Sequence, residues 1–95
     1  MFAVKVEYEV FPEYEKQNKD RIQDFLKAFE ELDNSRFRYS VFQDRESKRF
    51  IHLSEYKDEE IQKDLLSNLV FLKFQEERDK NLKEAPSITW LDCIL

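Results

Sequence analysis

The side chains that could do acid–base or metal chemistry are few. The chain of 95 residues contains one histidine, His52, and one cysteine, Cys93. A zinc site of the usual Cys/His type needs about four such ligands, and a nucleophilic triad would have to use His52 itself. We therefore expect neither a metal site nor a cofactor, and His52 becomes the candidate catalytic residue.

His52 lies in the run "RFIHLSEY", between apolar neighbours of a predicted strand. The favoured interpretation is a buried strand histidine whose nitrogens are satisfied by a neighbouring hydroxyl or carboxylate. A second is an acid/base group in a pocket, because imidazole titrates near neutral pH. A third is a hydrogen bond at a dimer interface. These alternatives stay open at the level of the sequence.

The partner of His52 depends on a predicted hairpin. The runs "RFRYSVFQ", Arg36 to Gln43, and "KRFIHLSEY", Lys48 to Tyr56, are separated by "DRES" and indicate two antiparallel strands with a four-residue loop. That loop places Tyr39 opposite His52 on one face of the sheet. A five-residue loop would move the partners to opposite faces.

Three aromatic residues are candidates for a ligand pocket near His52, namely Tyr39, Phe50 and Trp90. Trp90 is more often a core residue than a stacking platform, and its indole N–H needs a partner when buried. Cys93 has no basic neighbour to activate it and is expected to be a small buried residue. The run "EERDK", Glu76 to Lys80, is typical of a solvated helix face.

The rest of the chain supplies the elements that must position these residues. Apolar residues alternate from Phe2 to Phe11, as in a strand, and then recur at three and four along a helix from Tyr14 to Leu32. After the hairpin, Asp58 is the predicted N-cap of a helix with Ile61, Leu65 and Leu66 on its buried face. Ser67 and Asn68 break that helix and cap a second one. Its predicted buried face is Phe71, Phe74 and Leu82.

Pro86 ends the helical part, and "SITWLDCIL" forms the last strand. The predicted order is therefore strand, helix, strand, strand, helical segment, strand. This is the α+β, ferredoxin-like βαββαβ pattern, in which the helices cover one face of a four-stranded antiparallel sheet. Residues 1–95 are expected to form a single domain of this type.

Composition limits the partners of this domain. The formal net charge is −5, which argues against nucleic acid and against an anionic membrane surface. The chain has no glycine, and this excludes phosphate-binding loops of the glycine-rich kinds. Charged residues within the first ten positions do not resemble a secretory signal, and no apolar run reaches the length of a membrane span. We expect a soluble, cytoplasmic protein.

Both faces of the predicted sheet carry large apolar side chains. In the hairpin, Tyr39 and Val41 lie on one face and Phe42 on the other, while Ile51 and Leu53 oppose the face of His52. Helices can cover only one of the two faces. A second copy of the same sheet is the economical cover for the other, so the sequence predicts a homodimer.

The segment "YSVFQDRESKRFIHLSEYKDEEIQKDLLSNLVFLKF", Tyr39 to Phe74, resembles the dimeric α/β-barrel superfamily that includes antibiotic-biosynthesis monooxygenases. The resemblance lies in the hairpin, the acidic helix start after the third strand, and the broken helical segment with an aromatic end. It implies a dimer whose sheets face each other to form a barrel-like core, with small-molecule pockets in some members. The uncharacterised branch of the superfamily is the expected place of this chain.

The resemblance does not extend to the histidines of the superfamily's enzymes. Its oxygenases often place a histidine in the broken helical segment, where this chain has Leu65, Leu66, Val70 and Phe71. Haem-degrading relatives use an asparagine on the first strand together with a helix histidine, and both are absent here. The resemblance therefore does not imply haem.

Two functional classes follow. The first is a non-catalytic dimer that is structural or binds a small apolar or aromatic molecule. The alternative is a cofactor-independent, monooxygenase-like enzyme that acts on a small aromatic or enolisable substrate with His52 as the acid/base group. The missing helix histidines favour the first class. A pocket with His52 pointing into it would favour the second.

Overall fold

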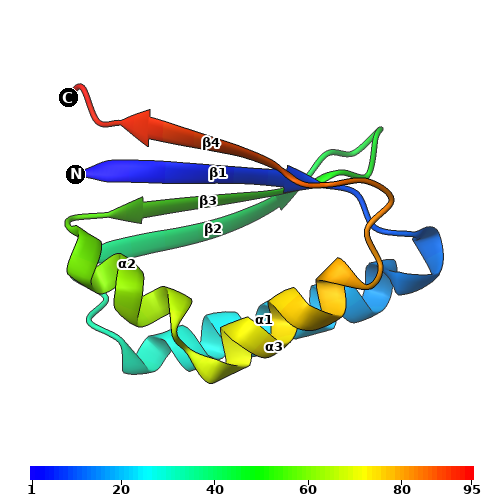
Figure 1. Ribbon diagram of the computed structural model, residues 1–95, viewed down its shortest axis with the longest axis horizontal. Helices are drawn as coiled ribbons and strands as arrows, with labels where there is room; N and C mark the ends of the chain where they lie inside the picture. Colours follow the sequence, from blue (N-terminus) through cyan, green and yellow to red (C-terminus); the bar gives the residue numbers. More distant parts are fainter.

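The four strands form one antiparallel sheet in the order β2-β3-β1-β4. In this computed structural model, which describes residues 1–95, the strands are β1 (Phe2–Tyr8), β2 (Phe37–Gln43), β3 (Phe50–Tyr56) and β4 (Ser87–Asp92). The helices lie together on one side of the sheet (Figure 1), and the two chain ends lie at the same end of the neighbouring strands β1 and β4. The predicted ferredoxin-like βαββαβ fold is confirmed.

The first helical segment is composite. The α-helix α1 (Glu15–Ala28) lies between two short 3₁₀ turns, η1 (Pro12–Tyr14) and η2 (Phe29–Glu31), where the sequence predicts one helix from Tyr14 to Leu32. Pro12 suits the first turn because its missing N–H would have no helical partner there. The predicted apolar stripe is confirmed for Ile22, Phe25 and Phe29, which are all buried.

Two predicted caps define the second helical segment, which consists of α2 (Glu59–Leu66) and α3 (Leu69–Asp79). The Asp58 carboxylate accepts the Ile61 N–H at 2.9 Å. The Asn68 side-chain oxygen accepts the N–H groups of Val70 and Phe71 at 3.0 and 3.1 Å. Local sequence therefore fixes where each helix begins, because these caps satisfy N–H groups that have no partner within the helix.

Two members of the predicted buried helix faces lie elsewhere. Leu66 is 42 % exposed, because it lies about 100° around the helix axis from Leu65, away from the buried face of Ile61 and Leu65. Leu82 lies beyond the end of α3 and forms an isolated β-bridge with Val10. It still packs against the core, but from the connection to β4 and not from a helix.

Aromatic rings fill the core between the sheet and the helices. Phe25 of α1 is fully buried and has five ring neighbours within 6.0 Å, which are Phe29, Tyr39, His52, Phe71 and Phe74. The ring planes are mostly tilted or edge-on, and these are arrangements that the quadrupoles of aromatic rings favour. This packing holds β2, β3, α1 and α3 around the candidate histidine.

The hairpin register differs from the prediction by two residues, while the faces are kept. Tyr39 pairs with Ser54, and His52 pairs with Val41. The ladder continues to Asp44, whose N–H donates to the Arg49 carbonyl at 2.8 Å, so the four loop residues are Arg45 to Lys48 rather than "DRES". A shift of two leaves every side chain on its predicted side of the sheet.

Asp44 and Lys48 together explain this turn. The Asp44 carboxylate accepts the backbone N–H groups of Glu46 and Ser47, each at 2.8 Å. Lys48 closes the loop with φ of 66°, the one positive φ in the chain. In a chain without glycine, a lysine therefore occupies a backbone conformation that glycine adopts without steric cost.

Trp90 and Cys93 are not buried, contrary to the expectations of a core tryptophan and a buried thiol. Trp90 is 65 % exposed although it pairs with Val4 on the helix side of the sheet. It belongs to β4, the edge strand farthest from β2 in the sheet order, and the helices do not cover it. Cys93 is exposed because it follows the end of that strand. No helix of the chain has the length and apolarity required to cross a bilayer.

We predict that the positive φ of Lys48 makes stability depend on how well the residue at this position tolerates that backbone conformation. Lys48→Val should lower the free energy of unfolding by about 1–2 kcal/mol, because a β-branched residue fits a positive φ poorly. Lys48→Gly should leave stability equal to or slightly above that of the unmodified protein. Chemical denaturation measures both. Equal destabilisation by the two variants would contradict the assigned turn.

Candidate functional site

A pocket of about 200 Å³ lies between the helix side of the sheet and the pair of helices α2 and α3. Thirteen residues line it, of which eight are hydrophobic. The sheet contributes His52, Tyr39 and Trp90 among others, and α3 contributes Phe71 and Arg78. This volume lies below the range of about 300–1,000 Å³ for drug-sized ligands, so the pocket suits only a smaller molecule.

The structure brings together three of the four candidate site residues. His52, Tyr39 and Trp90 all line the pocket. Phe50 does not line it, because its ring stacks on Tyr8 at 5.4 Å between centroids and is 2 % exposed. Phe50 thus lies two residues along β3 from His52, on the same face but in the packed core.

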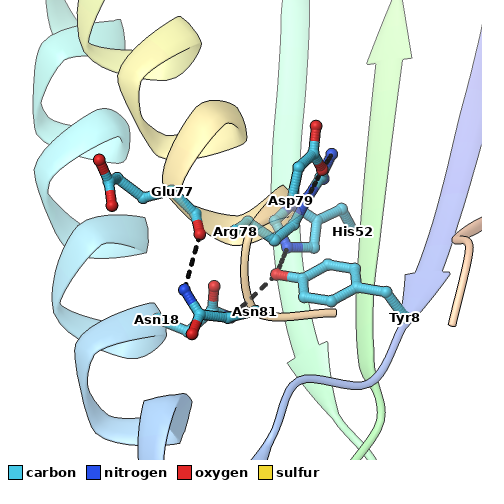
Figure 2. A network of polar contacts seen from close by, with 7 residues as sticks. All are labelled: Tyr8, Asn18, His52, Glu77, Arg78, Asp79 and Asn81. Carbon is cyan, nitrogen blue, oxygen red and sulfur yellow. Dashed lines mark hydrogen bonds and ion pairs between the residues drawn. The ribbon is translucent and has the colours of Figure 1, made fainter. Parts of the chain in front are cut away.

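His52 is held by two tyrosine hydroxyls. Its Nε2 lies 2.7 Å from the Tyr8 Oη, and its Nδ1 lies 2.7 Å from the Tyr39 Oη. The Tyr8 hydroxyl also accepts a hydrogen bond at 2.9 Å from Nδ2 of Asn18 in α1. Asn18, Tyr8, His52 and Tyr39 thus form a continuous row of hydrogen bonds, called the row below. Figure 2 shows the Tyr8 hydroxyl between the histidine of β3 and the asparagine of α1. The prediction that a neighbouring hydroxyl satisfies His52 is confirmed.

The row has a direction that follows from the orientation of the Asn18 amide. Because Tyr8 accepts from Asn18, its own proton is free to donate to Nε2 of His52. The imidazole proton then lies on Nδ1 and donates to the Tyr39 oxygen. In this orientation the amide oxygen of Asn18 has no protein partner. If the amide were reversed, the two N–H donors would take the place of the oxygen and would themselves have no partner. Buried N–H groups without a partner are rarer than buried oxygens without one, so the orientation described here is favoured.

His52 is neutral in this setting. Burial lowers its pKa to about 3 from the usual 6.5, and the positive charge of Arg78 adds to the effect. Burial also raises the pKa values of Tyr8 and Tyr39 above their usual 10.0. At neutral pH the row therefore holds uncharged groups only, and His52, which lines the pocket, is a weak base.

Arg78 and Asn18 are functional candidates that the sequence interpretation missed. Arg78 is 8 % exposed and lines the pocket, whereas the "EERDK" run containing it was predicted to be a solvated face. The guanidinium lies over the rings of Tyr8 and Phe74 at 5.2 and 5.5 Å. The spacing of the sequence indicates that Arg78 lies on the buried face of α3, because it follows Phe71 and Phe74 at intervals of three and four residues. Asn18 likewise precedes Ile22 by one helical turn.

No group of three or more His, Cys, Asp or Glu side chains is arranged to share a metal ion. Hydrogen bonds in turns and ion pairs at the surface lower the pKa values of the carboxylates of Asp44, Asp58 and Glu77. These carboxylates accept backbone N–H groups or pair with Arg36, Lys73 and Lys80, and none lines the pocket. The chemistry available in the pocket is therefore hydrogen bonding, aromatic contact and the charge of Arg78.

No family model matches the sequence, and no curated protein matches it. Solved structures do match the fold. The chain is similar over its whole length, and that of the other chain, to a crystal structure of an antibiotic biosynthesis monooxygenase, with a TM-score of 0.85 and 12 % identity. The protein Rv0793 from Mycobacterium tuberculosis matches with a TM-score of 0.85 and 12 % identity, over 99 % of this chain and 95 % of that one.

A protein of unknown function from Nitrosomonas europaea, NE2512, matches with a TM-score of 0.77 and 16 % identity, over 99 % of this chain and 89 % of that one. The chain thus has the ferredoxin-like fold of the antibiotic-biosynthesis-monooxygenase-like proteins. The resemblance noticed in the sequence is confirmed at the level of the fold. Some of these structural neighbours are called monooxygenases, and one is described as a protein of unknown function.

We predict that burial of neutral His52 makes stability depend on pH. Between pH 6.5 and about 3, His52 is protonated in the unfolded chain but not in the folded chain. The free energy of unfolding therefore falls as the pH falls through this window. The slope should approach about 1.4 kcal/mol per pH unit. Urea denaturation at several pH values down to about 5 measures it before most carboxylates titrate. His52→Gln should flatten this slope, and an equally steep slope in the variant would contradict the assignment.

Proposed function

We propose that this chain is a cytoplasmic, dimeric, small-molecule-binding protein whose ligand occupies the pocket beside Tyr39. The observation that carries the proposal is the pocket itself, which lies beside the densely packed aromatic core, on the side of the sheet where Trp90 and Ile88 are exposed. Aromatic and aliphatic side chains make most of its wall, with a few polar groups at defined positions, as in small-molecule sites generally. The single exposed cysteine, Cys93, suits a reducing compartment.

Binding is favoured over catalysis by the protonation of the row. A general base works best when its pKa lies near the working pH. The pKa of His52 is about 3, and that of Tyr39 is raised above 10.0, so at neutral pH neither group readily takes or releases a proton. A fixed row of neutral hydrogen bonds is better suited to orienting a ligand than to moving its protons.

The dimer is supported by the sheet face that the helices leave open. Phe42 of β2 and Leu91 of β4 lie on this face and are 57 % and 40 % exposed. Lys5 and Glu7 lie between them on β1, 3.8 Å apart, so the face carries both signs of charge. A two-fold axis would bring this surface against its own copy, covering apolar residues and matching opposite charges.

We predict that a small aromatic ligand changes the emission of Trp90, the one tryptophan of the chain, because its indole forms part of the pocket wall. Gln62→Phe should block the pocket and abolish the response, since Gln62 lines it. Lys63→Phe, next to it but outside the wall, is the matched control and should respond normally. Fluorescence titration with a panel of small aromatics makes the measurement. A panel without any saturable response would contradict the proposed function.

We predict a stable homodimer at micromolar concentration. Its interface should total about 2,000 Å² or more, the size of obligate dimers. Phe42→Arg should give monomers, because an unpaired charge would be buried in the interface at the β2 edge of the face. Leu72→Arg, at a site of similar kind on α3 that is 43 % exposed, should remain dimeric. Sedimentation velocity distinguishes the two states, and a monomeric unmodified protein would contradict the dimer.

A second function is favoured by the fold comparison, since one matching structure is called an antibiotic biosynthesis monooxygenase. A cofactor-independent enzyme of this kind would take an enolisable or phenolic substrate that supplies all four electrons to O₂. One oxygen atom would enter the substrate and the other would leave as water. His52 would act through Tyr39 as the acid/base relay. Oxygen consumption with a hydroquinone, lost in Tyr39→Phe, would support this function over binding alone.

A further inference from the structure

We infer that the pocket selects a small, flat molecule that carries an ionised oxygen group, a carboxylate in the simplest case. This inference rests on the proposed binding function and adds the charge and shape of the ligand. It starts from the pocket wall, where Arg78 is the one charged residue among the thirteen that line it. A pocket whose one charged side chain is a largely buried cation favours an anion and disfavours a cation.

The guanidinium of Arg78 is only partly neutralised within the chain. Its Nε and Nη2 both donate to one oxygen of Asp79, at 3.1 and 3.0 Å. The Asp79 side chain is 58 % exposed while that of Arg78 is 10 % exposed, so the carboxylate is largely solvated and the guanidinium largely buried. Nη1 makes no hydrogen bond to any protein group. These donors remain for a ligand oxygen, and a guanidinium hydrogen-bonds strongly to carboxylates.

The row of hydrogen bonds adds a second donor. Each proton in the sequence Asn18, Tyr8, His52, Tyr39 is donated to the next member, and the hydroxyl proton of Tyr39 is the one left without an acceptor. Tyr39 lines the pocket together with Arg78. The pocket thus has two hydrogen-bond donors, the Tyr39 hydroxyl on the sheet and the Arg78 guanidinium on α3. A ligand that pairs with both must carry hydrogen-bond acceptors.

The remaining wall sets the shape of the ligand. Phe71 and Tyr56 contribute ring surfaces, and Trp90 and Ile88 of the edge strand form the outer side with exposures of 65 % and 59 %. Flat apolar surfaces of this kind suit a planar ring. A volume of about 200 Å³ limits the ligand to about the size of one or two rings.

The experiment uses the matched probes benzoate and benzamide, which have nearly the same shape but differ in charge. Trp90 fluorescence and isothermal titration calorimetry report their binding to the intact protein. Benzoate should bind at least about tenfold more tightly than benzamide, the difference expected for hydrogen bonds to charged groups. Equal or tighter binding of benzamide would overturn this inference while leaving the binding function standing. Binding of neither probe would overturn both.

Variants test whether Arg78 is the source of the preference. Arg78→Gln should remove the preference for benzoate, whereas Asp79→Asn should raise benzoate affinity severalfold by freeing the guanidinium from its competing carboxylate. Arg49→Gln is the control, because Arg49 pairs with Glu84 at 3.2 Å and lies outside the pocket wall. Melting curves recorded for each variant identify any loss of folding. If Arg78→Gln does not fold, an unchanged affinity in Asp79→Asn is by itself sufficient to overturn the inference.

Discussion

The requirement that a buried imidazole keep both nitrogens hydrogen-bonded organises the interior of this protein. His52 is 2 % exposed, and an unsatisfied buried polar group costs about 1–3 kcal/mol. Its two partners come from different strands, Tyr8 on β1 and Tyr39 on β2, and Asn18 extends the row into α1. The hydrogen-bond row therefore connects three strands and a helix at one level of the core, and it fixes the sheet register and the position of α1 together.

The same requirement determines what the histidine can do. Burial that makes a hydrogen bond strong also penalises the charged imidazolium, and Arg78 adds to the penalty. A histidine of this kind is a positioning group: it transmits the direction of the hydrogen bonds from Asn18 to the hydroxyl of Tyr39. The alternatives of a satisfied buried residue and a pocket residue are thus compatible here, because His52 is 2 % exposed and is also part of the pocket wall.

Much of the architecture is encoded by local patterns. The caps Asp58 and Asn68 and the stripe through Phe25 were predictable because each depends on residues within a turn or two of the helix. The faces of the hairpin strands also followed from alternation. The exact pairing did not, because it depends on the unusual backbone of Lys48, whose residue type gives no signal of a positive φ.

The pocket was less predictable, because its composition results from the spatial arrangement of distant segments. Arg78 follows Tyr39 by 39 positions in the chain, and only the packing of α3 on the sheet brings the two residues to one cavity. The exposure of Trp90 has the same origin. The helices pack over β2, β3 and β1, and the edge strand β4 extends past their cover, so its helix-side residues become a wall of the pocket rather than part of the core. In this fold a binding site arises beside the edge of the helix layer: β4 forms its outer wall, and the hydrogen-bond row contributes His52 and Tyr39 to the rest of the wall.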